Sequence, residues 1–124
     1  MQELIKQQIA SFGYAFRGLR LLFQTEVHGR FHIFFAIFVI IASLFFKISI
    51  TEWCLVIGSI TIVIGAEAFN SAIESLTDLV SPERHPLAGK TKDMAAGSVL
   101  IVAIGAAIIG CIIFLPKVYN WIFN

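Results

Sequence analysis

One stretch of the sequence limits the possible folds more than any other: residues 94–115 contain no charged side chain. At a rise of about 1.5 Å per residue, a helix of that length crosses the roughly 30 Å hydrocarbon layer of a bilayer. Pro116 and Lys117 follow directly, as is typical where a membrane helix ends. The segment therefore predicts a transmembrane helix. The whole chain suits this solvent, because 58% of its 124 residues are hydrophobic and only 14% are charged.

Two further segments are apolar enough to belong to the same membrane domain. Residues 31–50 are apolar apart from His32 and Lys47, and the long lysine side chain can reach the interface from near the end of the span. Residues 53–66 are uncharged but too few to cross the bilayer, so we expect this helix to continue to residue 80. The predicted span 53–80 therefore carries ionisable side chains inside or at the edge of the membrane.

The segment before the first span predicts an amphipathic helix over residues 1–24. Apolar side chains recur there at alternating steps of four and three residues, and most of the polar side chains share the other face. We expect this helix to lie in the membrane surface; packing against a soluble core is the alternative, but the chain offers no such core. The first residues predict no cleavable signal peptide. Residues 81–93, with two prolines and a glycine, predict the loop before the third span.

The composition excludes several other classes of protein. A formal charge of +1 excludes a strongly basic nucleic-acid binder, and the shortage of polar residues excludes a disordered chain. Two cysteines do not make a disulfide scaffold, and Cys54 and Cys111 both lie in apolar runs where a small hydrophobic side chain is expected. We therefore expect an all-α membrane protein with a single domain over residues 1–124.

The basic residues predict the orientation of the spans. Seven of the nine Lys and Arg residues lie either before the first span or in the loop 81–93, and these segments share a side because two spans separate them. Lys47 and Lys117 fall on the opposite side. By the positive-inside rule, the N-terminal helix and the loop are cytoplasmic.

Polar side chains form a stripe on the predicted span 53–80. At 100° per residue, five of them project within about 100° of one another. They are Glu67, Asn70, Ser71, Glu74 and Asp78. With Trp53 at the outer boundary, Glu67 lies about 21 Å deep and Glu74 about 32 Å deep in a layer of roughly 30 Å. A charge at such a depth costs about 2.5 kcal/mol or more, which indicates a function.

The depth of this stripe favours chemistry at the inner interface over transport. The outer halves of the spans offer only hydroxyl groups and no polar path for an ion or proton. At the inner interface a lipid head group meets water-soluble molecules, and Glu26 adds a carboxylate at that level. Oxygen ligands of this kind suit Mg²⁺, which usually shares its coordination shell with substrate phosphates, and this points to a nucleotide. The alternative is structural: Glu67 and Glu74 pair with basic side chains such as Arg17, Arg30 or Lys92.

The Gly-Lys-Thr at residues 89–91 is not a Walker-type phosphate loop. The first glycine of that motif would fall at Arg84, and no strand precedes it. A bound nucleotide would instead be held by the metal and by basic side chains of the loop region. These are Arg84, His85, Lys90 and Lys92.

Two motifs resemble the small bacterial membrane diacylglycerol kinase family. They are Glu67 to Asp78 (EAFNSAIESLTD) and His85 to Gly97 (HPLAGKTKDMAAG), with Gly13-Tyr14, Gly18-Leu19-Arg20 and Glu26 extending the similarity toward the N-terminus. The resemblance implies homotrimers of three-span subunits with a surface helix, in the bacterial inner membrane. It also implies transfer of the ATP γ-phosphate to a lipid alcohol with Mg²⁺.

Matched by position, the resemblance implies that Glu67 is the general base and that Glu26 and Glu74 are metal ligands. It implies nucleotide contacts from Tyr14, Glu26, Glu74, Glu83, Arg84, His85, Lys92 and Asp93, support from Asn70 and Asp78, and lipid contact from Arg20. Two departures stand out. An arginine that some members use for ATP falls at Gln7, beside Lys6, and His28-Gly29 does not match the pattern that we expect and is assigned no role.

The lipid is chosen by resemblance alone. The run from Asp78 to Glu83 (DLVSPE), the His85-Pro86 pair and Ala95-Ala96-Gly97 are more similar to the undecaprenol kinase branch of the family. We therefore expect undecaprenol as the substrate, with diacylglycerol as the alternative. A small membrane transporter or structural subunit is the alternative from another class of protein. Small side chains over residues 103–111 also predict a face of the third span that permits close helix contact.

Overall fold

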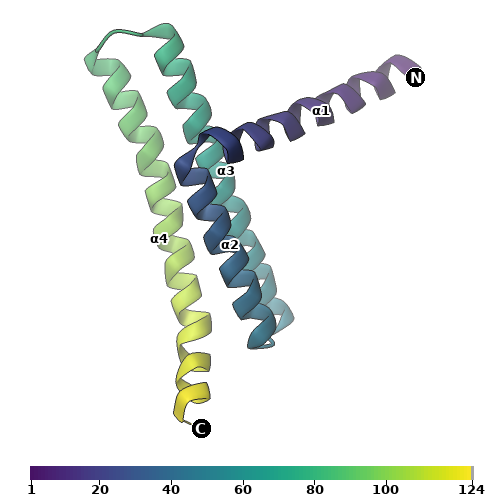
Figure 1. Ribbon diagram of the computed structural model, residues 1–124, viewed down its shortest axis with the longest axis vertical. Coiled ribbons are helices and arrows are strands. Elements are labelled where there is room, and N and C mark those ends of the chain that lie inside the picture. The colour runs from purple at the N-terminus through teal and green to yellow at the C-terminus, as the bar shows by residue number, and fades with distance from the viewer. Residues whose placement is uncertain (124) are drawn as a thin grey trace.

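The computed structural model describes residues 1–123, and all the regular structure in that range is helical. The four helices are α1 (Gln2–Thr25), α2 (Val27–Phe45), α3 (Ile50–Val80) and α4 (Pro86–Phe123). In Figure 1, α2, α3 and α4 run alongside one another, while α1 projects away from them at a steep angle. The expected all-α class is confirmed, and α2, α3 and α4 are each long and apolar enough to cross a membrane.

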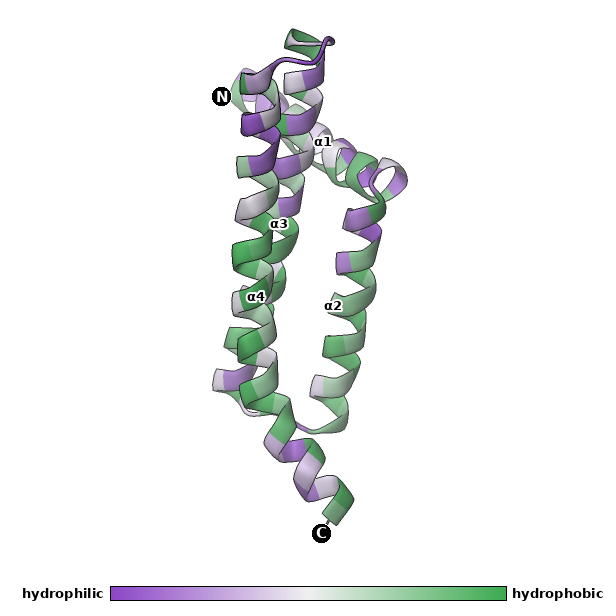
Figure 2. Cartoon of the chain, turned by 90° about the vertical axis from the view of Figure 1, so that its left-hand side faces the viewer, coloured by the Kyte–Doolittle hydropathy of each residue, from purple (hydrophilic) through white to green (hydrophobic). Residues whose placement is uncertain are grey.

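Most large apolar side chains of these helices face outward. Phe34, Ile101 and Ile112 are each about two thirds exposed or more. Figure 2 shows hydrophobic residues along the middle of α2, α3 and α4, whereas hydrophilic residues gather toward the end that holds the α3–α4 loop. We call this end the loop end and the opposite end, at the α2–α3 connection, the turn end. Such an apolar exterior is that of a multi-pass membrane protein, because lipid tails cover it.

Helices α3 and α4 form the most extensive contact of the molecule. An ion pair marks their antiparallel register at each end: Asp78 with Lys92 near the loop, and Glu52 with Lys117 (Oε1 to Nζ, 3.0 Å) near the turn end. The two pairs enclose nearly equal lengths of helix, residues 52–78 and 92–117. The two helices therefore stay in step, and the level of a residue on one can be read across to the other.

The turn between α2 and α3 is closed by local hydrogen bonds. After α2, Lys47 adopts the left-handed region (φ 50°), and the Ile48 N–H donates to the Ser43 carbonyl (3.2 Å). A capping box then starts α3: Ser49 Oγ accepts from the Glu52 N–H, and the Glu52 carboxylate accepts from the Ser49 N–H. This turn occupies residues 46–49, so α2 ends at Phe45, five residues before the end of the span expected from the sequence.

The connection between α3 and α4 is also shorter than the sequence suggested. It covers residues 81–85 rather than 81–93, because α4 starts at Pro86. Proline is favoured at the first position of a helix, where its missing N–H would have no helical partner. Lys92 and Asp93, expected in the loop, are therefore on the first turns of α4.

The far end of α4 extends beyond the expected exit at residue 116. The helix continues through Pro116 to Phe123, although proline cannot donate the hydrogen bond that would reach the carbonyl of residue 112. In Figure 2 the axis of α4 bends toward its C-terminal end, as helices do near an internal proline. Beyond the bend the last turns still contact α2, because the ring of Trp121 packs edge-to-face against that of Phe45 (centroids 5.9 Å apart).

Candidate active site

Glu67 and Asn70 are the buried polar side chains in the loop-end half of α3, with 3% and 9% of their surface exposed. They continue the buried face that Val56 and Val63 form nearer the turn end. At the level of Asn70, α4 buries Val99, and one turn nearer the loop it buries Ala95, a side chain small enough to let the two helices approach closely. Glu67 and Asn70 are thus a carboxylate and an amide on a helix face whose other buried residues, Val56 and Val63, are apolar.

Among the residues that the structure describes, no cation pairs with Glu67 or Glu74. Within residues 1–123 the ion pairs are Lys6–Glu3, Lys92–Asp78 and Lys117–Glu52. The structural alternative, in which Glu67 and Glu74 pair with Arg17, Arg30 or Lys92, therefore does not describe this structure. Both carboxylates remain available for other partners.

Asn70 connects the buried part of the stripe to its more exposed part. Its Nδ2 donates to Glu74 Oε1 (3.1 Å), one turn further along α3. Its Oδ1 and the hydroxyl of Ser71 are buried and have no hydrogen-bond partner among the described side chains. A buried acceptor without a donor costs about 1–3 kcal/mol, so the amide oxygen is suited to receive a donor from a bound molecule or another chain.

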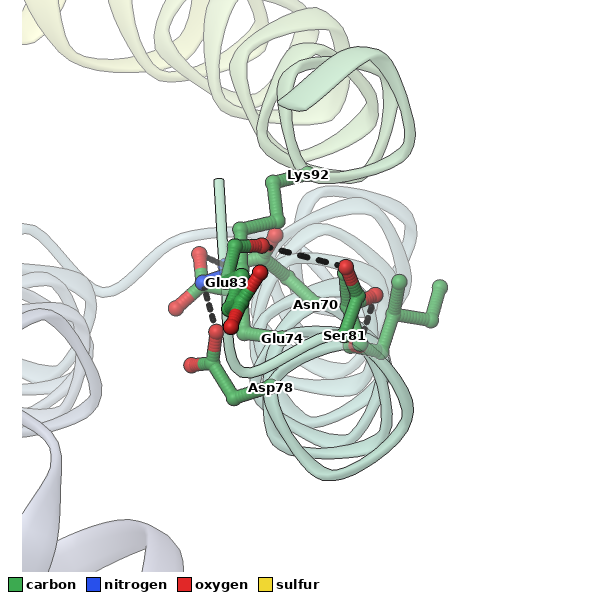
Figure 3. Close-up of polar contacts among 8 residues, drawn as sticks. Asn70, Glu74, Asp78, Ser81, Glu83 and Lys92 are labelled. Atoms are coloured by element: carbon green, nitrogen blue, oxygen red, sulfur yellow. Dashed lines mark hydrogen bonds and ion pairs between the residues drawn. The ribbon is translucent and has the colours of Figure 1, made fainter. Parts of the chain in front are cut away.

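Lys92 reaches across from α4 to the Asp78 carboxylate on α3 (Figure 3). Around this pair the α3–α4 loop forms a hollow of about 510 Å³. Five residues expected at the site from the sequence line this hollow: Asp78, Glu83, Arg84, His85 and Lys92. The structure therefore brings together four of the eight expected nucleotide contacts, Glu83, Arg84, His85 and Lys92, with the supporting residue Asp78.

Hydrogen bonds hold the loop that forms this hollow. Ser81 Oγ donates to the Glu83 carbonyl (3.1 Å), as Figure 3 shows. The ring of His85 accepts from the Leu87 N–H (Nδ1 to N, 3.2 Å), which satisfies one of the free N–H groups at the start of α4. His85 thus has a structural task at the helix end in addition to its place in the hollow.

Glu26 lies at the elbow between α1 and α2 and is half buried. Its extended backbone (φ −96°, ψ 120°) ends one helix and starts the next. A Cβ on Gly29 would lie 2.9 Å from the Leu22 carbonyl oxygen, so the close approach of the two helices at this elbow requires glycine. The sequence assigned no role to His28-Gly29. In the structure, Gly29 allows the close approach of α1 and α2 at this elbow.

Other expected site residues are not brought to the hollow. Asp93, Tyr14 and Arg20 do not line it, and all three are exposed. The Arg17 guanidinium lies over the Tyr14 ring at 5.9 Å from its centroid. No group of three or more His, Cys, Asp or Glu side chains converges on a metal position in the part of the chain that the structure describes.

One feature of the site region was missed from the sequence. An apolar cavity of about 380 Å³ lies among α2, α3 and α4 on the turn-end side of Glu67. The small side chains of Ala103, Ala106, Ala107 and Gly110 could have indicated this space, but we interpreted them as a face for close helix contact. In this structure the same four residues form one wall of the cavity.

The chain is similar in sequence to a known protein family and to several of its members. Residues 13–114 match the sequence profile of the family described as prokaryotic diacylglycerol kinase. The chain is similar to the undecaprenol kinase of Bacillus subtilis, with 40% identity over 86% of this chain and 87% of the relative. It is 36% identical to the diacylglycerol kinase of Synechocystis sp., over 90% of this chain and 65% of that relative. It is also 36% identical to the diacylglycerol kinase of Haemophilus influenzae, over 75% and 79% respectively. These relatives are named for different lipids.

Proposed function

Because the chain belongs to the prokaryotic diacylglycerol kinase family and is a membrane lipid kinase, we propose that it phosphorylates undecaprenol, with ATP as the phosphate donor. The product is undecaprenyl phosphate. The 40% identity to a relative named undecaprenol kinase supports this choice of lipid. Diacylglycerol is the second candidate, since other relatives carry that name. Family membership sets aside the transporter and the structural subunit.

The observation that carries the chemistry is the buried, unpaired Glu67 carboxylate at the hydrocarbon edge of the polar stripe. In the proposed reaction, the lipid hydroxyl oxygen bonds to the γ-phosphorus of ATP and its proton passes to Glu67. The bond from the γ-phosphorus to the bridging oxygen breaks, and ADP leaves with the electron pair. Phosphoryl transfer needs mainly alignment and charge neutralisation, so one base and a set of cations suffice.

Mg²⁺ is the proposed metal, with Glu26 and Glu74 as its protein ligands. The donor set fits, because Mg²⁺ prefers oxygen ligands and is commonly bound by one or two carboxylates plus substrate phosphates. Asn70 engages Oε1 of Glu74 and leaves the second oxygen for a ligand. The ion would neutralise charge on the phosphates.

The hollow at the α3–α4 loop is the proposed place for the nucleotide phosphates. Arg84 and Lys92 supply cationic donors there, and phosphate oxygens form short, charge-assisted bonds with such groups. Lys92 would exchange Asp78 for phosphate when ATP binds. Tyr14, Glu83, His85 and Asp93 remain proposed nucleotide contacts, and Arg20 a proposed lipid contact.

The proposed setting is a homotrimer in the bacterial inner membrane, with α1 on the cytoplasmic surface. α1 carries exposed apolar side chains beside basic ones and stands apart from the bundle, which suits a membrane interface. The buried Asn70 oxygen without a donor supports a neighbouring subunit or ligand at that face. The hydrophilic loop end would then face the cytoplasm, where ATP is available.

The test is a kinase assay on the purified protein in mixed micelles, with radiolabelled ATP, Mg²⁺, and either undecaprenol or diacylglycerol. We expect labelled lipid from both alcohols, with kcat/KM higher for undecaprenol. A tenfold preference for diacylglycerol, about 1.4 kcal/mol in transition-state free energy, would overturn the choice of lipid. Absence of label in every lipid from folded protein would overturn the function.

A further inference from the structure

The Ser71 hydroxyl is a buried polar group that the proposed mechanism does not use. Its Oγ is buried and has no hydrogen-bond partner within residues 1–123. The hydroxyls of Ser43, Thr61 and Thr77 each donate to the carbonyl oxygen four residues earlier, as is common in helices. Ser71 does not make this bond to the Glu67 carbonyl, so its donor is free for another acceptor.

In the described chain, the facing helix α4 offers this hydroxyl no partner. When the register is read across, the polar side chain of α4 at the level of Ser71 is Ser98. The Ser98 hydroxyl donates to the Ala95 carbonyl of its own helix (2.6 Å). The acceptor for Ser71 therefore comes from α3 itself, from a bound molecule or from another chain.

Two carboxylates of α3 lie within about one turn of Ser71, and Glu67 is the better acceptor. Helix side chains lean toward the N-terminal end of their helix, which for Ser71 is the direction of Glu67. The two residues are four apart, and their projections differ by about 40° at 100° per residue. Glu74 lies toward the C-terminal end and already accepts from Asn70.

A neighbouring pair on the same helix shows that this spacing permits a bond. Asn70 donates to Glu74, also four residues away, over 3.1 Å. Glu67 and Ser71 have the same spacing, with the donor and the acceptor in the reverse order. A bond between them needs only rotation about side-chain torsions, because residues four apart are neighbours on a helix surface.

We propose that Ser71 is a positioning residue for the general base: its hydroxyl donates a hydrogen bond to the Glu67 carboxylate when the lipid alcohol binds. This inference rests on the proposed function for the role of Glu67. One oxygen of Glu67 then holds the serine donor, and the other faces the lipid hydroxyl whose proton it receives. Each of the two carboxylates thus has its own polar neighbour on α3, Ser71 for Glu67 and Asn70 for Glu74.

The bond acts on the chemical step rather than on binding. A base that a third group orients keeps the geometry that proton transfer requires. Ser71 touches neither ATP nor the lipid, so its loss should lower kcat and leave both KM values nearly unchanged. The Mg²⁺ requirement should also stay the same, because Asn70 rather than Ser71 holds Glu74.

The proposal also predicts an unusual relation between activity and stability. A buried hydroxyl without a partner lowers the stability of the free protein. Removing it should therefore leave the melting temperature equal or higher while the reaction slows, as is typical of a residue kept for function. A serine with a purely structural task would show the opposite, a lower melting temperature.

The experiment measures kcat, both KM values and the melting temperature of the full-length protein in mixed micelles. We expect Ser71→Ala to lower kcat about tenfold, with each KM within twofold, and Ser71→Thr, which keeps a hydroxyl, to stay within threefold of the parent. Ser71→Cys keeps the size but donates weakly, so it should resemble Ser71→Ala. Ser75→Ala removes an exposed hydroxyl one turn further along α3 and should change none of these values.

A double-mutant cycle with Glu67→Gln shows whether Ser71 acts through Glu67. If it does, Ser71→Ala should lower kcat less than twofold in the Glu67→Gln background, instead of tenfold. Equal factors in both backgrounds, or an unchanged kcat in Ser71→Ala, would overturn the proposal. A lower melting temperature or a changed mass of the assembly in Ser71→Ala would overturn it too, because the hydroxyl would then bond to another chain.

The same cycle separates this inference from the proposed function. If Glu67→Gln lowers kcat a hundredfold and Ser71→Ala does not lower it, only the role of Ser71 is wrong. If Glu67→Gln leaves kcat unchanged, Glu67 is not the base and both proposals are wrong, whatever Ser71→Ala does.

Discussion

Asn70 Nδ2 donates a hydrogen bond to Glu74 Oε1 over 3.1 Å. The bond fixes one oxygen of the Glu74 carboxylate and orients the other away from the amide. It links a residue that is almost fully buried to one that is half exposed. The side chain proposed to bind the metal is therefore positioned by the buried part of the same helix face.

Loss of this bond should weaken metal binding. Asn70→Ala removes the donor and frees the Glu74 side chain, so we expect the Mg²⁺ concentration for half-maximal activity to rise about tenfold. The measurement is a Mg²⁺ titration at saturating ATP. Ser71→Ala is the matched control, because it removes the neighbouring buried hydroxyl without touching Glu74. An equal effect of both variants would show that the bond has no special role.

Glu67 and Glu74 should fail in different ways when neutralised. Glu67→Gln is expected to lower kcat about a hundredfold or more, as loss of a general base does, with Mg²⁺-ATP binding nearly unchanged. Glu26→Gln and Glu74→Gln should weaken Mg²⁺-ATP binding as well. Steady-state kinetics combined with direct nucleotide binding measures the difference. Equal Mg²⁺-ATP affinity in all three variants would contradict these assignments.

The Lys92–Asp78 ion pair should matter for activity more than for stability. Both side chains are partly exposed, and exposed pairs contribute about 0–1 kcal/mol. We expect Asp78→Asn to change the melting temperature by only a few degrees, and Lys92→Met to raise KM for ATP about tenfold. Lys117→Met removes the same charge at the turn end and should leave KM for ATP unaltered. If it raises KM equally, the effect of Lys92 is not local.

Gly29 should tolerate no side chain. The Cβ of Gly29→Ala would lie 2.9 Å from the Leu22 carbonyl oxygen, a backbone atom, so one of the two helices must shift. We expect a loss of about 1–3 kcal/mol in stability together with reduced activity, because Glu26 lies between these residues. Gly18→Ala is the control, since its Cβ would meet no atom within 4 Å and alanine favours a helix. Thermal unfolding in detergent compares the two variants.

Assembly can be measured directly. We expect the mass of the active protein in detergent to correspond to three chains, because an acidic stripe on α3 is costly against lipid and needs a covering partner. The measurement is light scattering or native mass determination on a fraction whose activity is assayed at once. A fully active monomer would contradict the trimer.

The helical architecture was predictable from the sequence because hydrocarbon thickness imposes a length on apolar segments. The uncharged residues 94–115 fall inside α4, and the stripe of Glu67, Asn70 and Glu74 lies on one helix as the 100° step requires. The exact first and last residues of each helix were harder to predict from the sequence. They depend on local chemistry such as the capping box of Ser49 and the first-turn position of Pro86, which hydropathy does not measure.

The candidate site was predictable in its residue types but not in its distances. The sequence placed Asp78 and Lys92 near one site, yet their direct contact depends on the α3–α4 register, which only packing determines. The apolar cavity was inaccessible for the same reason. Alanines on α4 indicate either close contact or empty space, and the distance to α2 decides between them.

The two ion pairs of the α3–α4 contact have a mechanical consequence. If Lys92 leaves Asp78 for a phosphate, the pair at the loop end is lost, but the extensive packing of α3 on α4 and the Glu52–Lys117 pair remain to oppose sliding of the helices. A slip of one helical turn would displace Lys92 by about 5.4 Å and separate it from the stripe on α3. Each catalytic cycle can therefore release and restore the inner contact while the two long helices keep the same alignment.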